Sequence, residues 1–211
     1  MTFPTDTLRV RFFRHGESAA NAGLPSDAPA AIPLTDHGMA QAAEIAGGIG
    51  AAPDLIITSP FLRARQTAAP TIARFPGIPV LSLAIQEFTY LSPARCAGTT
   101  VHQRRPWADA YWQAEDPQRV EGEDAESFRL FHRRVTGALT QLADYRQQGR
   151  RDILVFGHGQ FLQATRLFIA GQLSAVDGPT MRRFRQIDLG TPIANGQGFA
   201  ALHDDAGWRL G

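Results

Sequence analysis

The stretch that decides the fold is VRFFRHGESAANAG, residues 10–23. It begins within LRVRFF, residues 8–13, whose branched and aromatic side chains are typical of a buried strand. The apolar run ends abruptly at Arg14, His15 and Gly16, and small polar residues follow. In α/β sheets, ligands bind outside the carboxyl ends of the strands. A cation and an imidazole at that position therefore predict a ligand site directly after the first strand.

The composition is that of an ordinary globular protein, with 44% hydrophobic and 19% charged residues. A chain of 211 residues is long enough for one well-filled core but short for two full domains. We expect a single domain over residues 1–211. No apolar run approaches the roughly 18 to 20 residues of a membrane span, and MTFPTDTLRV at the N-terminus lacks the features of a signal peptide.

The same numbers limit the partners. A net charge of +1 gives no broad field that would favour nucleic acid or a membrane surface, so we expect neither as a partner. The lone Cys96 cannot form an internal disulfide and fits a reducing compartment, which favours the cytoplasm. The sequence leaves the oligomeric state open.

All 21 basic side chains are arginine, because the sequence contains no lysine. The absence of lysine excludes a Schiff-base lysine and the lysine of a phosphate-binding P-loop. Any anion must therefore be held by guanidinium groups, imidazoles or backbone N–H groups.

Segments with strand and helix patterns alternate along the chain. Strands are predicted over residues 8–13, 54–59, 78–83 and 152–157, with two late candidates at 184–189 and 198–203 on either side of an NGQG turn. Helices are predicted from Thr35 or Asp36 to about 49, and over 61–75, 128–149 and 160–171. From Glu87 to Glu123 the pattern loses its rhythm, which indicates an insertion at about 88–121.

This alternation predicts an α/β fold, a three-layer α/β/α sandwich around a mostly parallel sheet. Its strand ends would meet at one edge. Arg14 and His15 follow the first strand, Arg63 the second, Glu87 the third and His158 the fourth. Four strand ends would thus bring two imidazoles, two guanidinium groups and a carboxylate together.

Such a set of groups suits a compact dianion such as a phosphoryl group. Guanidinium groups match phosphate oxygens bidentately, and charge on a transferring phosphoryl spreads over its equatorial oxygens. One imidazole would then be free to attack phosphorus in line and form a phosphohistidine. A carboxylic acid could protonate the departing alkoxide and afterwards activate water.

The motifs RFFRHGESAAN (11–21), TSPFLRARQTA (58–68) and VFGHGQF (155–161) resemble the histidine phosphatase superfamily, the phosphoglycerate mutase-like proteins. LTDHGMAQA (34–42) and AESFRLFHRRV (125–135) extend the resemblance over nearly the whole chain except 88–121. The three motifs occur in order, each at an expected strand end, which makes the match specific.

The resemblance implies catalytic roles for His15 as nucleophile, Glu87 as proton donor and His158. It also implies a phosphate pocket made of Arg14, Asn21, Arg63 and His158. The aromatic-glycine pattern common after the family's acid is absent here, where FTYLSPARCAGTT (88–100) follows Glu87. Plainer interpretations remain open, because Arg63 could be a solvated helix residue and Asn21 a turn residue.

The insertion leaves two interpretations. Arg104, Arg105 and Trp107 could form a lid that selects the substrate. Alternatively, Trp107, Tyr111 and Trp112 could pack an added helix against the sheet. The other histidines, at positions 37, 102, 132 and 203, are expected to be structural or exposed, with His102 open.

The sequence therefore predicts a metal-independent phosphomonoester hydrolase that uses no cofactor, forms a phosphohistidine and acts on a small phosphorylated metabolite. The alternatives are a phosphoglycerate mutase, or a phosphoryl-binding protein with weak turnover. Mutases that resemble this family carry a Gly-Trp-x-Asp stretch where this chain has SDAPAAIPLTDHG (26–38), which favours hydrolysis. No HExxH or CxxC spacing supports a zinc hydrolase, and no GxSxG supports a serine hydrolase.

Overall fold

A computed structural model describes residues 6–25 and 28–211. Residues 1–5 of the N-terminal stretch, and Ser26 and Asp27 of the segment compared with mutases, lie outside the described residues. The strands are β1 (Leu8–Arg14), β2 (Leu55–Thr58), β3 (Val80–Ser82), β4 (Asp152–Gly157), β5 (Gly198–Asp204) and β6 (Gly207–Leu210). The helices are the 3-10 turn η1 (Pro29–Ala31), α1 (Asp36–Gly48), α2 (Leu62–Arg74), α3 (Pro93–Cys96), α4 (Val101–Gln113), α5 (Phe128–Gln147), α6 (Gly159–Ile169) and α7 (Gly178–Gly190).

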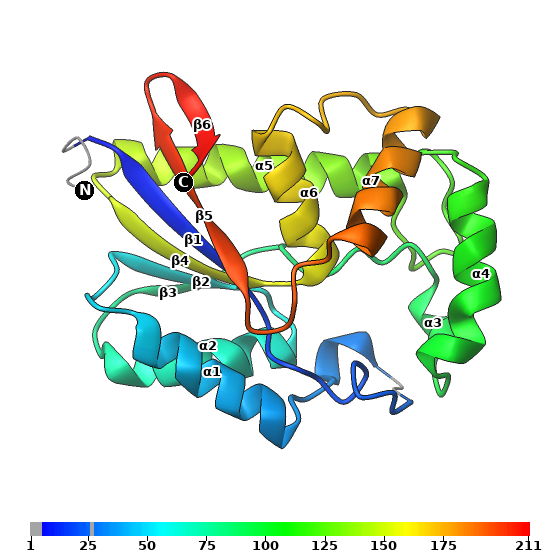
Figure 1. The fold of residues 1–211 in the computed structure, drawn as a ribbon, viewed down its shortest axis with the longest axis horizontal. Coiled ribbons are helices and arrows are strands. Elements are labelled where there is room, and N and C mark those ends of the chain that lie inside the picture. Colours follow the sequence, from blue (N-terminus) through cyan, green and yellow to red (C-terminus); the bar gives the residue numbers. More distant parts are fainter. Residues whose placement is uncertain (1–5, 26–27) are drawn as a thin grey trace.

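The strands form one sheet in the order β3-β2-β4-β1-β5-β6. The first four of these are parallel, and β5 and β6 join antiparallel at one edge. Figure 1 shows α1 and α2 on one side of the sheet and α5 and α6 on the other. The predicted three-layer α/β/α sandwich with a mostly parallel sheet is confirmed.

Side chains alternate between the two faces of the central strands, as the pleat requires. Ile56 on β2 and Leu154 and Phe156 on β4 pack with α1 and α2. Their neighbours Ile57 and Val155 belong to the larger core on the α5 and α6 side. Because both faces are covered, β2 and β4 are continuous apolar runs, and they hold their carboxyl ends in fixed register.

The helix start predicted at Thr35 or Asp36 is found at Thr35, whose hydroxyl accepts a hydrogen bond from the Gly38 N–H at 3.1 Å. This cap places the N-terminus of α1 beside the loop that follows β1. A Cβ atom on Gly16 would lie 2.4 Å from the Gly38 carbonyl oxygen, and one on Gly38 would lie 2.0 Å from the Glu17 oxygen. Only glycine allows the two backbones to approach this closely.

The strand predicted at 184–189 is wrong, because these residues lie in α7. Asp177 caps that helix by accepting from the Thr180 N–H at 2.8 Å. Met181 and Phe184 are fully buried three residues apart, and Ile187 packs against the same core. Apolar residues spaced by three lie on one face of a helix. Within 184–189 alone, the alternation of apolar and polar residues also fits a strand. The true partner of β5 at the edge is β6, which the sequence pattern did not indicate.

The insertion at 88–121 contains α3 and α4 at the side of the molecule in Figure 1, and α4 lies beside α7. Thr100 and Gln103 form a reciprocal capping box at the start of α4. Tyr111 and Trp112 are buried in the main core, 0% and 7% exposed. Tyr111 and Trp112 thus pack the added helix α4 into the core, but the ring of Trp112 contacts Phe128 of α5 and Phe184 of α7, where the sequence predicted packing against the sheet. Among the described residues, no helix is both long and apolar enough to cross a membrane.

Candidate active site

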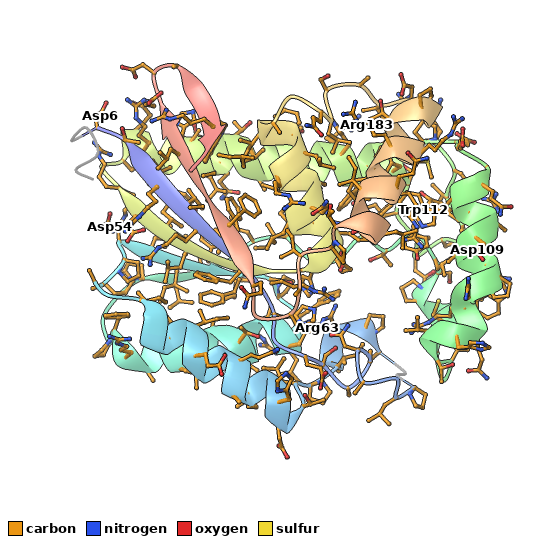
Figure 2. The ribbon with its side chains drawn as sticks, viewed as in Figure 1. Asp6, Asp54, Arg63, Asp109, Trp112 and Arg183 are labelled. Atoms are coloured by element: carbon orange, nitrogen blue, oxygen red, sulfur yellow. The ribbon has the colours of Figure 1, made fainter. Side chains whose placement is uncertain are left out.

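The carboxyl ends of β1, β2 and β4 lie side by side. The register pairs Arg14 with Gly157 and Thr58 with Phe156, so that the residues following each strand emerge at one edge of the sheet. Figure 2 shows Arg63, from the first turn of α2, at this edge. The sheet register therefore brings together groups that are far apart in the sequence.

His15 is 3% exposed and its ring is fixed at both nitrogens. Nδ1 lies 2.7 Å from the Gly16 carbonyl oxygen, and Nε2 lies 3.1 Å from Nε of Arg63. A carbonyl only accepts and a guanidinium only donates, so Nδ1 carries the proton and Nε2 the lone pair. Burial, followed by the charge of Arg63, lowers the pKa of His15 to about 3. At neutral pH the ring is uncharged.

Arg63 is buried at 7% exposure, so it is not a solvated helix residue. Besides its bond to His15, it donates to the Pro29 carbonyl oxygen at 2.7 Å, and its guanidinium lies 5.0 Å from the centre of the Phe61 ring. Burial lowers the pKa of Arg63 to about 10, opposed by the nearby charge of Glu87. The group stays cationic at neutral pH.

Arg14 is the second cation of the site. It donates to the Ile193 carbonyl oxygen at 2.7 Å, while its buried Nε has no hydrogen-bond partner among the described residues. A Cβ on Gly159 would lie 3.2 Å from that Nε. Glycine at the start of α6 therefore leaves room for the guanidinium beside the helix N-terminus.

His158 is fully buried, and its ring centre lies 5.1 Å from that of His15. Nε2 is 2.8 Å from the hydroxyl of Ser59, whereas Nδ1 has no partner among the described residues. Burial, followed by the charge of Arg63, lowers the pKa of His158 well below its usual value. A second uncharged imidazole thus lies beside the first.

Glu87 is partly exposed, but its carboxyl group is held closely. Oε1 accepts from the backbone N–H groups of Phe88 at 3.1 Å, Gln160 at 3.0 Å and Phe161 at 3.3 Å. Burial raises the pKa of Glu87, while Arg14 and Arg63 act to lower it. The structure therefore places Glu87 within electrostatic reach of both guanidinium groups of the site.

Asn21 lies in the loop after β1 and is exposed. Its side-chain oxygen accepts from the Ser18 N–H and hydroxyl at 3.1 and 2.8 Å, contacts of a turn residue. It also accepts from Nδ2 of Asn195 at 3.2 Å, which in turn donates to the His15 carbonyl oxygen at 3.0 Å. Within residues 6–25 and 28–211 its amide nitrogen has no hydrogen-bond partner, and the role of Asn21 as a phosphate donor stays a prediction.

The three residues predicted as a lid all lie on α4. Arg105 is exposed and lies 3.8 Å from Asp109 one turn along. Trp107 lies under the guanidinium of Arg95, 4.1 Å from the ring centre. Arg104 is partly buried near Cys96. Among the described residues, none of the three contacts the side chains of the site, and a role in substrate selection stays a prediction.

Several polar residues of the site were not singled out from the sequence. Ser59 directly follows β2 and precedes Arg63, and this position at a strand end is a signal by which a site residue can be recognised. Asn195 lies in NGQG, which was interpreted only as a turn. Asp188 is largely buried, and burial raises the pKa of its carboxyl. It lies in the segment predicted as a strand, so its helical face could not be recognised.

The residues of the site hold no evident metal set. Among residues 6–25 and 28–211, no group of three or more His, Cys, Asp or Glu side chains could hold a metal ion. The polar groups at the strand ends instead comprise two cations, two neutral imidazoles and a carboxyl group. The cations suit the oxygens of a phosphoryl group, and the carboxyl group suits a proton donor.

Comparison with known proteins identifies a family of phosphatases. The model of the histidine phosphatase superfamily (branch 1) matches residues 10–190. No match was found among curated proteins. The α-ribazole phosphatase from Shigella flexneri is similar in structure, with a TM-score of 0.71, 23% identity, and 97% and 95% of the two chains covered.

Two further solved structures are similar over nearly their whole length. The mycobacterial glucosyl-3-phosphoglycerate phosphatase has a TM-score of 0.71 and 21% identity, with 97% of each chain covered. A phosphoserine phosphatase mutant from Entamoeba histolytica, in complex with phosphoserine, has a TM-score of 0.70 and 19% identity, with 96% and 94% covered. At this level of identity the likeness concerns the fold.

Proposed function

Because the chain belongs to the histidine phosphatase superfamily, branch 1, we propose that it is a phosphomonoester hydrolase that forms a phosphohistidine on His15. One observation carries the proposal. The Nε2 lone pair of His15 is buried on an uncharged ring, at the side of the guanidinium of Arg63. An imidazole in this state is a nucleophile next to a group that binds phosphate oxygens.

Substrate binding follows from the same contacts. The phosphoryl oxygens take hydrogen bonds from Arg14 and Arg63, and His158 and the amide of Asn21 complete the pocket. Arg14 has a buried Nε that finds no hydrogen-bond partner in the part of the chain that the structure describes, which supports this role. As the guanidinium of Arg63 turns to the phosphoryl oxygens, its bond to His15 is released and Nε2 faces phosphorus.

The reaction then runs in two steps. Nε2 of His15 bonds to phosphorus as the ester P–O bond breaks, and Glu87 gives its proton to the departing oxygen. In the second step Glu87 takes a proton from water, whose oxygen attacks phosphorus and breaks the P–N bond. Inorganic phosphate leaves and His15 returns to its neutral state. The hydrogen bond from Nδ1 to the Gly16 oxygen holds the ring in the required tautomer throughout.

The substrate we propose is a small phosphorylated metabolite, with no cofactor or metal ion, in the cytoplasm. The named activities of the similar structures, on a ribazole phosphate, a glucosyl phosphoglycerate and phosphoserine, support a small phosphomonoester as the substrate class. They do not agree on one leaving group. The leaving group of this enzyme has to be identified by a panel of sugar phosphates, phosphoglycerates, nucleotides and phosphopeptides.

A pulse of 32P-labelled alkyl phosphate, quenched in base, tests the proposal. We expect acid-labile label on the wild-type protein and none on His15→Ala, with equal label in the presence of excess EDTA. His102→Ala is the matched control, since its side chain is exposed. Phosphate release without any protein-bound label would contradict the phosphohistidine. Label with no net hydrolysis would indicate a phosphoryl-binding protein, and isomerisation of phosphoglycerate exceeding phosphate release would indicate a mutase.

A further inference from the structure

Two carboxyl groups from distant parts of the chain meet at one residue, Gln160. Its backbone N–H donates to Oε1 of Glu87 at 3.0 Å, and its side-chain Nε2 donates to Oδ2 of Asp188 at 3.0 Å. Glu87 follows β3, whereas Asp188 lies in the last turn of α7. Gln160, in the first turn of α6, therefore holds the carboxyl of Asp188 close to that of Glu87.

The hydrogen bonds of Glu87 leave one oxygen for a proton. Oε1 accepts three backbone N–H groups, from Phe88, Gln160 and Phe161. Oε2 has no hydrogen-bond partner among the described residues. Backbone N–H groups only donate, so a proton on Glu87 must be carried by Oε2.

The charges around Glu87 are mostly positive and favour the carboxylate. The titratable groups that face Glu87 or Asp188 are Arg14 from β1, His15 after it, Arg63 from α2, Tyr90 after Glu87, Arg134 from α5, His158 before α6 and Arg185 from α7. Arg134 is paired with Glu126 at 2.6 Å, and both imidazoles are uncharged. Among the described residues, Asp188 supplies the negative charge that opposes the guanidinium groups at Glu87.

We propose that Asp188 is a positioning residue for the acid of the proposed reaction, and that its negative charge holds the proton on Oε2 of Glu87. The role rests on the proposed phosphatase function. Without Asp188, Arg14 and Arg63 would favour loss of that proton before the substrate binds. After the proton has passed to the leaving oxygen, the new carboxylate lies beside Asp188, and the repulsion favours removal of a proton from water in the second step.

The ion pair between Arg185 and Asp188 is weak, so the negative charge of Asp188 still acts on Glu87. Arg185 lies 3.5 Å from Oδ2 of Asp188, and its guanidinium also stacks on Trp112, 5.0 Å from the ring centre. Burial raises the pKa values of both Glu87 and Asp188. Because the charge of Asp188 also raises the pKa of Glu87, the two desolvated carboxyl groups that Gln160 links hold a proton to higher pH than either would alone.

The variant Asp188→Asn tests the role, because the amide keeps an oxygen that accepts from Gln160 and removes only the charge. The measurement is kcat/KM against pH with an alkyl phosphate, whose leaving oxygen needs a proton. We expect the alkaline limb to move to lower pH by about one unit, because one negative charge is removed from the surroundings of Glu87. With p-nitrophenyl phosphate, whose leaving group needs no proton, Asp188→Asn should leave the pH profile unchanged.

The matched control is Asp177→Asn, which removes a carboxylate from the exposed start of the same helix while asparagine keeps the cap. Its profile should equal that of the wild type. Arg185→Gln provides an independent variant, since loss of the cation beside Asp188 should move the limb to higher pH. If Asp188→Asn does not fold, as judged by circular dichroism, the shift of the alkaline limb in Arg185→Gln tests the proposal instead.

The proposal is overturned if the alkaline limb stays in place in both Asp188→Asn and Arg185→Gln. It is also overturned if the wild-type profile has no alkaline limb. Glu87→Gln separates this failure from that of the proposed function. If Glu87→Gln hydrolyses the alkyl phosphate poorly while Asp188→Asn keeps the wild-type limb, only the role of Asp188 is wrong. If Glu87→Gln is as active as the wild type, the acid itself has been assigned wrongly.

Discussion

On one side of the candidate site, His15 and His158 directly continue β1 and β4, whereas on the other side Glu87 lies in a loop after β3 and Asp188 on a helix near the C-terminus. The first pair is fixed by the sheet, whose register leaves the two rings 5.1 Å apart. The second pair is fixed by the amide groups of Gln160. The first pair belongs to the proposed phosphate pocket, here called the phosphate side, and depends on backbone pairing. The second pair contains the proposed acid, here called the acid side, and depends on contacts between loops and helices.

This difference has a physical consequence. A parallel ladder buried on both faces cannot slip without exposing apolar side chains, so the phosphate side is rigid before substrate arrives. Loops and helix termini shift at a smaller cost, so the acid side can adapt to different leaving groups. We expect substitutions on the phosphate side to affect every substrate alike, and substitutions on the acid side to depend on the leaving group.

The largest expected effect comes from Arg63→Ala. Loss of a guanidinium that binds the phosphoryl oxygens should lower kcat by about 10²-fold or more for every substrate, as the loss of an oxyanion donor does. Steady-state kinetics with an alkyl and an aryl phosphate measure it. The control is Arg65→Ala, whose side chain is exposed on the same helix. An Arg63→Ala enzyme of undiminished activity would remove Arg63 from the phosphate pocket.

The buried imidazoles should make the folded protein sensitive to acid. Burial lowers the pKa of His15 to about 3, so below its usual value of 6.5 the unfolded chain binds a proton that the folded chain does not. Stability therefore falls as the pH drops from 6.5 towards 3, by about 2 kcal/mol for this residue at about pH 5. Urea unfolding of the wild type and His15→Asn at about pH 7 and pH 5 measures the difference. His15→Asn should lose less stability, and His102→Asn should behave as the wild type.

The residues of the site that the strand pattern predicts lie at the ends of strands or a few residues after them. Arg14, His15 and His158 are adjacent in sequence to apolar strands, so their meeting followed from the strand pattern alone. Asp188 could not be found in this way. The alternation over residues 184–189 also fits a strand, and Gln160, which binds the carboxyl group of Asp188, is 28 residues away in the chain. Contacts between side chains on loops and helices have no period that a sequence reveals.

A smaller loss is expected from Gly16→Ala, which probes the loop after β1. The new Cβ would lie 2.4 Å from the Gly38 carbonyl oxygen, and two backbones would have to separate. We expect a loss of about 1 to 2 kcal/mol in stability, measured by urea unfolding, together with lower kcat because His15 adjoins the site of the change. Gly47→Ala in α1, where the new Cβ meets nothing within 4 Å, should stabilise the protein by about 0.5 to 1 kcal/mol.

The smallest expected effect concerns Arg105 on α4, a residue predicted as part of a lid. Arg105 is exposed and lies 3.8 Å from Asp109, and an exposed pair of this kind contributes at most about 1 kcal/mol to stability. Arg105→Ala should change kcat/KM for a simple alkyl phosphate by less than about twofold, since no contact links it to the site.

A phosphomonoester that carries a second anionic group sharpens this test, because long-range attraction by Arg105 would then appear as a salt-dependent loss of kcat/KM in Arg105→Ala. The matched variant Arg185→Gln should affect both substrates through Asp188, whatever the charge of the leaving group. If Arg105→Ala impairs only the doubly anionic substrate and the loss persists at high salt, α4 reaches the substrate during turnover. The acid side would then extend into the insertion, and the contrast with the rigid phosphate side would become larger.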